Sequence, residues 1–337
     1  MNILIVGLGS IGQRHLRVLK KNLRKKVNFF TLKSSKNKIV IQDDFKFKRV
    51  SSVAKHYNVK KISISEIENY KINTAIISNP PNLHLQTALN LLKRKCNLLI
   101  EKPLSTSSSS EIKKIKKIIG LAKKYKLVVQ VGYQLRFHPG IKIIKEIIKK
   151  KQFGEIINGY FHFGEYTGAL KKFENFTNSI YVNKKKGGGA LATFSHHLDL
   201  ALFFLGKLKC KYSILRNTHN FKIDVEDSCK VILTNNKNKN FLFNLNFLDN
   251  PQENFIILNF QKGSLKWNYV ENNLIIKKYK KPKEKVFYFK NFKRNTLFEK
   301  QIYNFLSNIN NKKFKNDSLN DGYKVMKLIH EIKKKAD

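Results

Sequence analysis

The chain has 337 residues, enough for about two domains, and 42% of them are hydrophobic, which argues against an intrinsically disordered protein. Its 67 lysines and arginines against 23 acidic residues give a formal charge of +44, but only 8 of the 67 are arginine, the residue best suited to phosphates and base edges. Because the lysines are spread through every segment alongside abundant Asn, Ile and Phe, we attribute the charge to AT-rich codons rather than to a nucleic-acid partner.

Membrane and secreted classes are also disfavoured. The chain has no uncharged apolar run of about 18 residues, so no membrane-spanning helix is expected. The apolar start MNILIVGLGSIG has no basic region before it and is interrupted by glycines, which makes it a poor signal peptide. Cys96, Cys210 and Cys229 lack metal-binding spacing and are expected to be free thiols in the cytoplasm.

The first 125 residues alternate short apolar runs with amphipathic stretches. This alternation predicts an α/β domain with a parallel, doubly wound sheet over residues 1–125. The expected strands are 3–6, 27–32, 74–78, 97–100 and 127–131, and the expected helices are 12–24, 82–94 and 110–125.

The pattern changes after Gly132, which indicates a second domain, assigned to residues 126–337. Short strands separated by turn residues predict an α/β domain with a large open, mainly antiparallel sheet. Its expected elements are helix 141–151, strand 156–163, a polar excursion over 164–186, helix 190–205, strands 212–215, 229–234, 241–247, 255–260, 274–279 and 286–289, and helices 297–308 and 322–334. The last two helices are candidates to pack back on the first domain.

Gly7, Gly9 and Gly12 form the pattern G-x-G-x-x-G between the first expected strand and helix. The first glycine permits a tight turn, the second lets the backbone approach a pyrophosphate, and the third lets helix and strand pack closely. The helix N-terminus adds N–H groups and a partial positive charge. We therefore predict a dinucleotide site here rather than a purely structural turn.

The end of the second expected strand bears on the choice of dinucleotide. An NAD site usually has an Asp or Glu about 20 residues after the glycines, where it binds the ribose 2′-hydroxyl. This chain has no acidic residue before Asp43, and the strand is followed by Lys33 and Ser34, which suit a 2′-phosphate. NADP is therefore favoured over NAD. The alternative is that Lys33 is one more surface lysine.

The sequence E-K-P at Glu101 to Pro103 follows another buried strand, at the edge where open α/β sheets bind ligands. Lys102 at this edge can hydrogen-bond a sugar hydroxyl and stabilise a developing alkoxide. Such a lysine is more often only solvated, so its interpretation depends on the other motifs.

Five segments, in order, resemble the glucose-fructose oxidoreductase, inositol dehydrogenase and rhizopine catabolism (Gfo/Idh/MocA) family. They are GLGSIGQRH (7–15), AIISNPPNLHLQTALNLLKRKCNLLIEKPLS (75–105), VGYQLRFHP (131–139), GGGALATFSHHLD (187–199) and FQKGSLKW (260–267). The resemblance implies an N-terminal Rossmann domain, a second α/β domain whose open sheet often joins subunits, and nicotinamide-dependent chemistry on sugars, inositols or polyols. A homodimer or homotetramer is therefore expected.

The resemblance also assigns roles to single positions. Besides the three glycines, the residues that it implies at the cofactor are Ser10 and Ile11 at the diphosphate, Asn79, Pro80 and His84 beside the nicotinamide, Glu101 and Lys102 at its ribose, and Gln134 and Arg136 near cofactor and substrate. Lys102 is also implied to reach the substrate.

The family's second domain carries D-x-G-x-H-x-x-D, in which the His is a catalytic acid/base assisted by the first Asp. His196 and Asp199 match the H-x-x-D portion, so the resemblance implies catalytic roles for both, with Lys102. Ala192 replaces the first Asp, with Thr193 beside it, which puts the Asp-assisted relay in doubt. The form T-x-S-H-x-x-D resembles a subgroup found beside nonulosonic-acid and other surface-glycan genes, which implies a sugar or nucleotide-sugar substrate.

The sequence thus predicts an NAD(P)-dependent oxidoreductase that transfers a hydride to or from a carbinol carbon of a sugar, nucleotide sugar or polyol. Two other functions stay open: a cofactor-binding sensor or partner subunit without dehydrogenase activity, and a lyase or hydrolase that uses transient oxidation. His197 is the alternative acid/base, and His15 is expected to be structural. No metal, membrane or specific nucleic-acid partner is expected.

Overall fold

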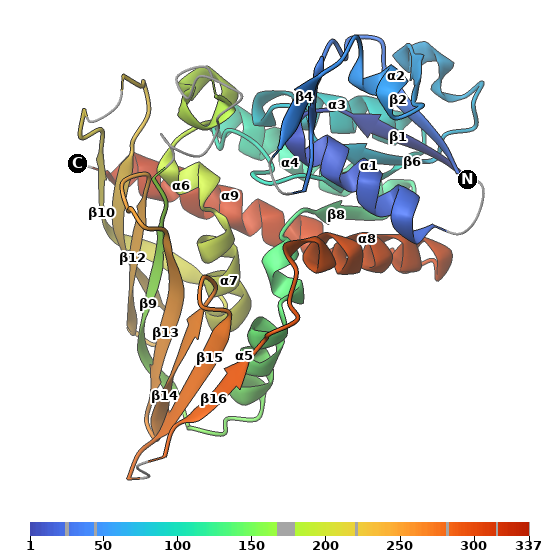
Figure 1. The fold of residues 1–337 in the computed structure, drawn as a ribbon. Helices are drawn as coiled ribbons and strands as arrows, with labels where there is room; N and C mark the ends of the chain where they lie inside the picture. The colour runs from blue at the N-terminus through green and yellow to red at the C-terminus, as the bar shows by residue number, and fades with distance from the viewer. Residues whose placement is uncertain are drawn as a thin grey trace. The chain divides into compact units, whose positions relative to one another are not determined.

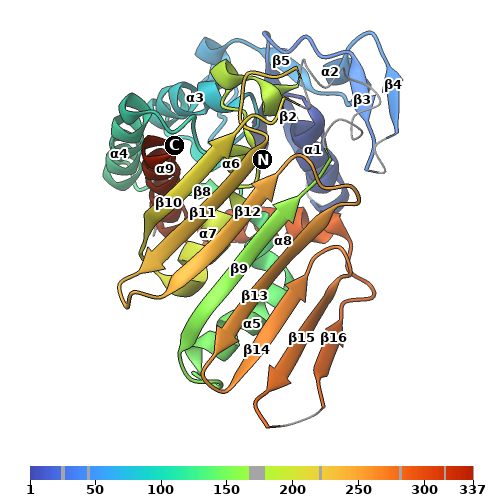
Figure 2. The same cartoon turned by 90° about the vertical axis from the view of Figure 1, so that its left-hand side faces the viewer.

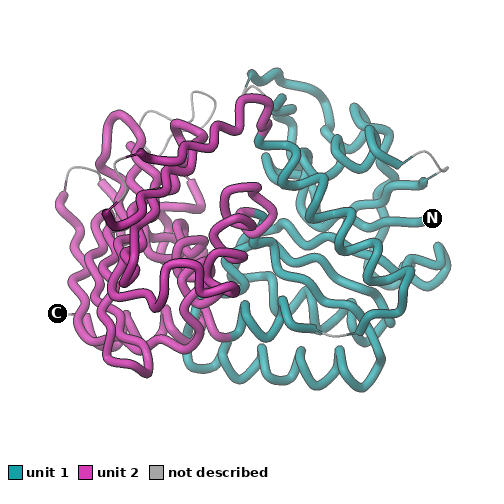
Figure 3. Tube along the Cα trace, turned by 90° about the horizontal axis from the view of Figure 1, so that it is seen from below, with its two compact units in different colours: residues 1–134, 294–323 teal, residues 135–293, 324–337 magenta. Residues whose placement is uncertain are grey.

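The computed structural model of the protein describes residues 1–23, 27–43, 46–166, 179–219, 222–280, 283–314 and 316–336. Its helices and strands are labelled in Figures 1 and 2. The chain forms two compact units (Figure 3), each made of two stretches. Unit 1 comprises residues 1–134 and 294–323, and unit 2 comprises residues 135–293 and 324–337.

Unit 1 is built on a six-stranded parallel sheet with the order β5-β2-β1-β6-β7-β8. This doubly wound order confirms the fold expected from alternating strands and helices. The edge strand β8 (Val129–Val131) pairs with β7, so the sheet continues past residue 125. The other strands are β1 (Asn2–Val6), β2 (Asn28–Leu32), β5 (Lys60–Ile62), β6 (Thr74–Ile77) and β7 (Asn97–Ile100), with a separate pair β3 (Ile39–Ile41) and β4 (Phe47–Arg49). The helices are α1 (Ser10–Asn22), α2 (Val53–His56), α3 (Pro81–Lys93), α4 (Ser109–Lys124) and α8 (Arg294–Asn310), with a 3₁₀ turn η1 (Ile64–Ile67).

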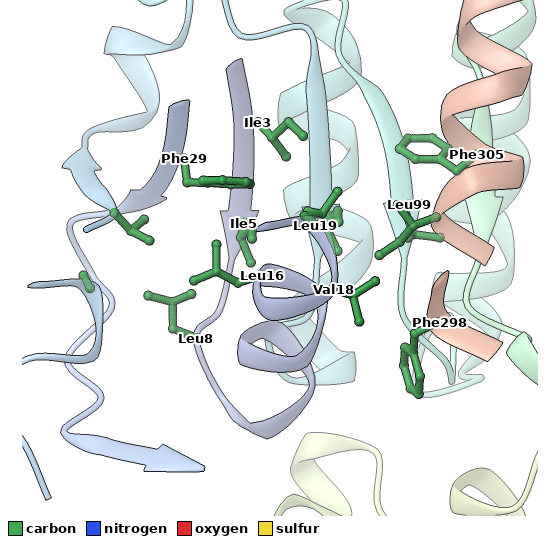
Figure 4. Close-up of a cluster of buried hydrophobic side chains, with 14 of the residues drawn as sticks. Ile3, Ile5, Leu8, Leu16, Val18, Leu19, Phe29, Leu99, Phe298 and Phe305 are labelled. Carbon is green, nitrogen blue, oxygen red and sulfur yellow. The ribbon is translucent and has the colours of Figure 1, made fainter. Parts of the chain in front are cut away.

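Helix α8 returns late in the chain to complete the core of unit 1. Leu16 and Leu19 of α1 belong to the same buried cluster as Phe298 and Phe305 of α8 (Figure 4). Burying apolar faces of both helices is the main favourable term in such packing. Helix α1, which begins at the glycine turn, is therefore held in place by a segment almost 300 residues away.

Unit 2 contains an eight-stranded sheet with the order β10-β11-β12-β9-β13-β14-β15-β16. The β9–β12 pair is parallel and the other pairs are antiparallel, which confirms the mainly antiparallel sheet. Figure 2 shows this sheet in front, with α5 and α7 behind it. The strands are β9 (Ile156–Gly164), β10 (Leu208–Arg216), β11 (Ser228–Asn235), β12 (Asn240–Asn246), β13 (Glu253–Phe260), β14 (Gly263–Asn268), β15 (Asn273–Lys278) and β16 (Lys285–Tyr288). The helices are α5 (Pro139–Lys149), α6 (Ala190–Thr193), α7 (His196–Leu205) and the last part of α9 (Asp317–Lys335), with 3₁₀ turns η2 (Gln134–Phe137), η5 (Ile180–Val182) and η6 (Lys184–Lys186).

Several sequence predictions need correction. The single helix predicted over 190–205 is wrong, because α6 ends at Thr193 and α7 begins at His196. Phe194 and Ser195 separate the two helices, and because neither is a glycine or a proline, the sequence carries no strong breaker signal there. The sequence does not predict strand β14, because its Gly-Ser start is typical of a turn. The short, lysine-rich β4 and β5 were missed as well.

Two further properties concern the whole described chain. No described helix combines the length and apolarity needed to cross a bilayer. All three cysteines are buried free thiols.

Candidate functional site

The glycine turn of unit 1 has the shape that the sequence predicts. Gly7 adopts φ +92°, and a Cβ there would lie 2.7 Å from the backbone nitrogen of Asn79. A Cβ on Gly12 would overlap the carbonyl oxygen of Gly7. A Cβ on Gly9, in contrast, would meet no atom within 4 Å. Gly7 and Gly12 therefore keep the turn tight, while Gly9 leaves its outer side open to a ligand.

Ser10 and Ile11 form the first turn of α1, directly after this opening. Gly9 is the N-cap and has no side chain with which to satisfy the helix N–H groups, and the first turn contains no acidic residue. A long helix that begins in this way offers N–H groups and a partial positive charge to an anion. The residues present thus fit a dinucleotide diphosphate.

Lys33 and Ser34 follow β2, but Lys33 has a partner that the sequence did not predict. Its Nζ lies 3.2 Å from Oε2 of Glu66, a residue of η1 after the neighbouring strand β5. Hydrogen bonds from the hydroxyl and N–H of Ser63, together with Lys33, lower the pKa of Glu66 to about 2. A carboxylate therefore lies at the end of β2 after all, although it comes from a distant part of the sequence.

The loop after β6 carries Asn79 and Pro80, and His84 connects it to the E-K-P loop. His84 is 1% exposed; its Nε2 lies 2.7 Å from the Asn79 carbonyl and its Nδ1 lies 3.0 Å from the Pro103 carbonyl. Burial lowers the pKa of His84, so the neutral ring donates to one of the two carbonyls at a time. His84 therefore ties the two loops together through their backbones.

Two amide oxygens near these loops are buried without a hydrogen-bond partner among the described residues. They are Oδ1 of Asn79 and Oε1 of Gln134. A buried acceptor without a donor costs free energy, and such atoms are often explained by a bound ligand. Their position after parallel strands fits acceptors for a ligand such as a nicotinamide carboxamide.

Glu101 and Lys102 directly follow β7. The Glu101 N–H donates to the Ile77 carbonyl at 2.9 Å, which continues the β6–β7 ladder, and the Lys102–Pro103 peptide bond is cis. The Glu101 carboxylate is buried beside His15, with Nε2 of His15 2.6 Å from Oε1 of Glu101. Lys102 is thus attached to a well-fixed strand end.

In unit 2, Arg136 and Asp199 form a two-pronged ion pair. Arg136 donates from Nε to Oδ2 at 2.8 Å and from its terminal nitrogen to Oδ1 at 2.5 Å. The Asp199 side chain is 1% exposed, and the guanidinium also lies 4.7 Å from the ring centre of Phe203. A carboxylate buried so completely requires such a partner. The pair connects η2 to α7.

His196 and His197 differ in their surroundings although they are neighbours on α7. His196, the first residue of the helix, is 5% exposed. His197 is fully buried against Phe163, with the ring centres 5.4 Å apart. Burial, with a contribution from His162, lowers the pKa of His197 to about 3, so this ring stays neutral near pH 7. Such a ring is poorly suited to exchange protons at neutral pH.

The segment that contains Ala192 holds another carboxyl that the sequence reasoning missed. A Cβ on Gly189 would overlap the Glu226 carboxylate, whose Oε1 accepts a hydrogen bond from Leu191 N–H at 3.3 Å. Burial raises the pKa of Glu226. This carboxyl caps the start of α6, and no spacing in the sequence connects the two segments. Much of the polar excursion over 164–186 lies outside the described residues.

Comparisons with known proteins agree with this geometry. Residues 1–133 match the model of the GFO/IDH/MocA oxidoreductase family with an NAD-binding Rossmann fold, and residues 141–266 match the GFO/IDH/MocA C-terminal domain. The chain belongs to the GFO/IDH/MocA family.

Individual relatives of this family member are distant. An inositol 2-dehydrogenase of Pseudarthrobacter chlorophenolicus is 26% identical over 141 residues, which are 42% of this chain and 37% of that protein. The matched part is thus less than half of that relative. A levoglucosan dehydrogenase in complex with NADH and levoglucosan superposes with a TM-score of 0.81 at 15% identity, covering 100% of this chain and 98% of the other. A 3-ketoreductase from Actinomadura kijaniata, in complex with NADP and TDP-benzene, superposes with a TM-score of 0.79 at 16% identity. This match covers 100% of this chain and 98% of the other. These structural matches establish the fold.

Proposed function

We propose that the protein is an NAD(P)-dependent oxidoreductase that transfers a hydride to or from a carbinol carbon of a sugar, nucleotide sugar or polyol. The observation that carries the proposal is the glycine cradle, in which Gly7 and Gly12 admit no side chain while Gly9 faces open space. The fixed strand end at Glu101 and Lys102 supports it. Family relatives named as dehydrogenases of inositol and of glucose 6-phosphate support the substrate class.

Each residue has a proposed task in this reaction. A nicotinamide supplies or accepts the hydride when bound. The first turn of α1 binds the diphosphate, and Asn79 and Gln134 offer acceptors to the carboxamide. Lys102 donates a hydrogen bond to the substrate oxygen and stabilises its negative charge as the C–H bond breaks or forms. His196 exchanges the hydroxyl proton.

Asp199 receives a positioning role in this proposal. Its carboxylate is bound at both oxygens by Arg136, which fixes the first turns of α7 relative to η2. We therefore assign to the pair the task of orienting His196 rather than a proton transfer. Glu226 stabilises the start of α6, next to the position where Ala192 replaces the family's first Asp.

The cofactor is proposed to be NADP, through Lys33. The ion pair with Glu66 holds the ammonium group at the end of β2, where a dinucleotide ribose binds in this fold. The pair is exposed, so a 2′-phosphate can compete with Glu66 for the lysine.

Replacing Lys33 with Ala should raise the Kd for NADPH by about tenfold and leave the Kd for NADH unchanged, because only NADPH carries the 2′-phosphate. The matched variant Glu66→Gln should lower the Kd for NADPH, because it removes the carboxylate that competes with the 2′-phosphate for Lys33. Titration of cofactor fluorescence measures both values. Equal changes for the two cofactors would contradict the assignment of Lys33.

A direct assay tests the proposed function. The protein is mixed with NADPH or NADH and a panel of keto sugars, and with the oxidised cofactors and a panel of sugars and polyols, while the absorbance of the reduced nicotinamide is followed. We expect cofactor turnover with at least one sugar. Tight cofactor binding without turnover on any substrate would favour a sensor or partner subunit. Product formation without net cofactor consumption would favour a lyase or hydrolase that uses transient oxidation.

The substrate subgroup is tested by the same panel. The motif T-x-S-H-x-x-D around His196 is the sequence feature that supports the proposal of a surface-glycan substrate. Nucleotide sugars in the panel should then be turned over faster than free inositols.

A further inference from the structure

His15 is a buried imidazole in α1 whose partner lies 86 residues further along the chain. The residue is 0% exposed, and its Nε2 lies 2.6 Å from Oε1 of Glu101. From the sequence alone, a structural role is expected for it. Its position three residues after Gly12 places it on the helix whose first turn is proposed to bind the diphosphate.

The Glu101 carboxylate is confined on several sides. Oε1 accepts from His15, and Oε2 faces the Lys102 N–H at 3.3 Å. A Cβ on Gly132 would lie 2.9 Å from Oε2 and 3.0 Å from Oε1. The carboxylate therefore fits only because residue 132 is a glycine. A carboxylate oxygen accepts hydrogen bonds, so we assign to His15 the tautomer that carries its hydrogen on Nε2.

The other side of the His15 ring has no comparable polar contact. Its Nδ1 is buried and has no hydrogen-bond partner among the described residues. The ring packs edge-on against Phe298 of α8, with the centres 5.4 Å apart at 76°. An unpaired buried nitrogen is unfavourable, and a leucine or phenylalanine would fill the same space without that cost. The imidazole is therefore best explained by its bond to Glu101.

We propose that His15 is a positioning residue that orients the Glu101 carboxylate toward the ribose on the nicotinamide side of the cofactor. The inference rests on the proposed function, because it needs a dinucleotide at the glycine turn. With Oε1 bound by His15, Oε2 is the oxygen available to a ribose hydroxyl. Helix α1 then acts on two parts of the cofactor. Its first turn binds the diphosphate. His15, little more than one turn later, orients the Glu101 carboxylate, which binds the ribose on the nicotinamide side.

The test separates the two halves of the cofactor. NADPH contains both ribose groups, whereas adenosine 2′,5′-bisphosphate contains only the adenosine half. His15→Leu should weaken NADPH binding by about tenfold, the size expected for losing one hydrogen bond to a charged group. It should change binding of adenosine 2′,5′-bisphosphate by less than about twofold. His15→Gln, which can still donate from its amide, should restore most of the NADPH affinity.

Two comparisons exclude a general structural effect. Gln13→Leu is the matched control, since Gln13 is also a buried polar residue of α1 but donates to the Leu8 and Ile39 carbonyls. Gln13→Leu should weaken the binding of NADPH and of adenosine 2′,5′-bisphosphate by the same factor. In a Glu101→Gln background, His15→Leu should cause no further loss of NADPH affinity, because its effect passes through that carboxylate.

The outcomes distinguish the inference from the function on which it rests. Wild-type protein that binds neither NADPH nor NADH would overturn the proposed function and the inference with it. Wild-type binding, together with equal losses for NADPH and adenosine 2′,5′-bisphosphate in His15→Leu, would overturn only the inference. Additive losses in the double variant would also overturn it. Should His15→Leu not fold, His15→Phe, which also has no donor for the Glu101 carboxylate, replaces it in the same comparisons.

Discussion

Replacing Lys102 with Ala is expected to lower kcat by about 10³-fold while changing the Kd of the cofactor only a few-fold. The ammonium group is proposed to stabilise charge that develops on the substrate oxygen, and removing such a donor costs this much in other enzymes. The backbone around Lys102 is fixed on both sides, by the Glu101 N–H bond to Ile77 and by His84 at the Pro103 carbonyl. The loss should therefore come from the missing side chain rather than from a displaced loop. Steady-state kinetics and cofactor titration measure the two effects separately.

Two substitutions serve as controls for Lys102→Ala. The first is Lys93→Ala, which removes the same charge from an exposed residue in the last turn of α3. This substitution should leave kcat unchanged. Lys102→Arg retains the charge, but its larger planar group places its donors differently and fits a single oxygen poorly. It should recover little activity. Turnover by Lys102→Ala within a few-fold of wild type would contradict the proposed role.

The features that the sequence predicts well are those encoded locally. The glycine turn needs three glycines within six residues between a strand and a helix, and the structure forms it from those residues. The strands around it are continuous apolar runs, as expected for a sheet covered on both faces. The alternation of strands and helices allows few topologies. The strand order of the six-stranded sheet is the doubly wound one that this alternation predicts.

The features that the sequence does not reveal depend on contacts between distant segments. Nothing near Lys33 indicates Glu66, because the two meet only when β5 pairs with β2. His15 and Glu101 likewise meet only across the folded sheet. The absence of acidic residues before Asp43 was a local observation, and it said nothing about carboxylates delivered by a neighbouring strand. The proposed preference for NADP therefore depends on competition between Glu66 and a phosphate for one lysine.

The adjacent residues His196 and His197 allow a direct comparison on one helix. His196→Ala should lower kcat by about 10²- to 10³-fold, because it removes the proposed proton-exchanging group. His197→Leu should leave kcat within a few-fold of wild type, because this ring is buried in the core and neutral near pH 7. The opposite pattern, with activity lost only in His197→Leu, would transfer the acid/base role to His197.

The pH dependence of stability tests the surroundings of His197 independently of activity. In the unfolded chain a histidine has a pKa of about 6.5, whereas burial lowers the pKa of His197 to about 3 in the folded protein. Below pH 6.5 the unfolded state therefore takes up a proton that the folded state does not, and stability falls by about 1.4 kcal/mol per pH unit until pH approaches 3. Between pH 7 and pH 5, the loss of stability measured by urea unfolding should be about 2 kcal/mol larger in wild type and in His196→Ala than in His197→Leu. The buried His84, whose pKa is also lowered, contributes equally to all three proteins. An equal loss in wild type and His197→Leu would show that this ring titrates normally, and the reason for preferring His196 as the acid/base would then disappear.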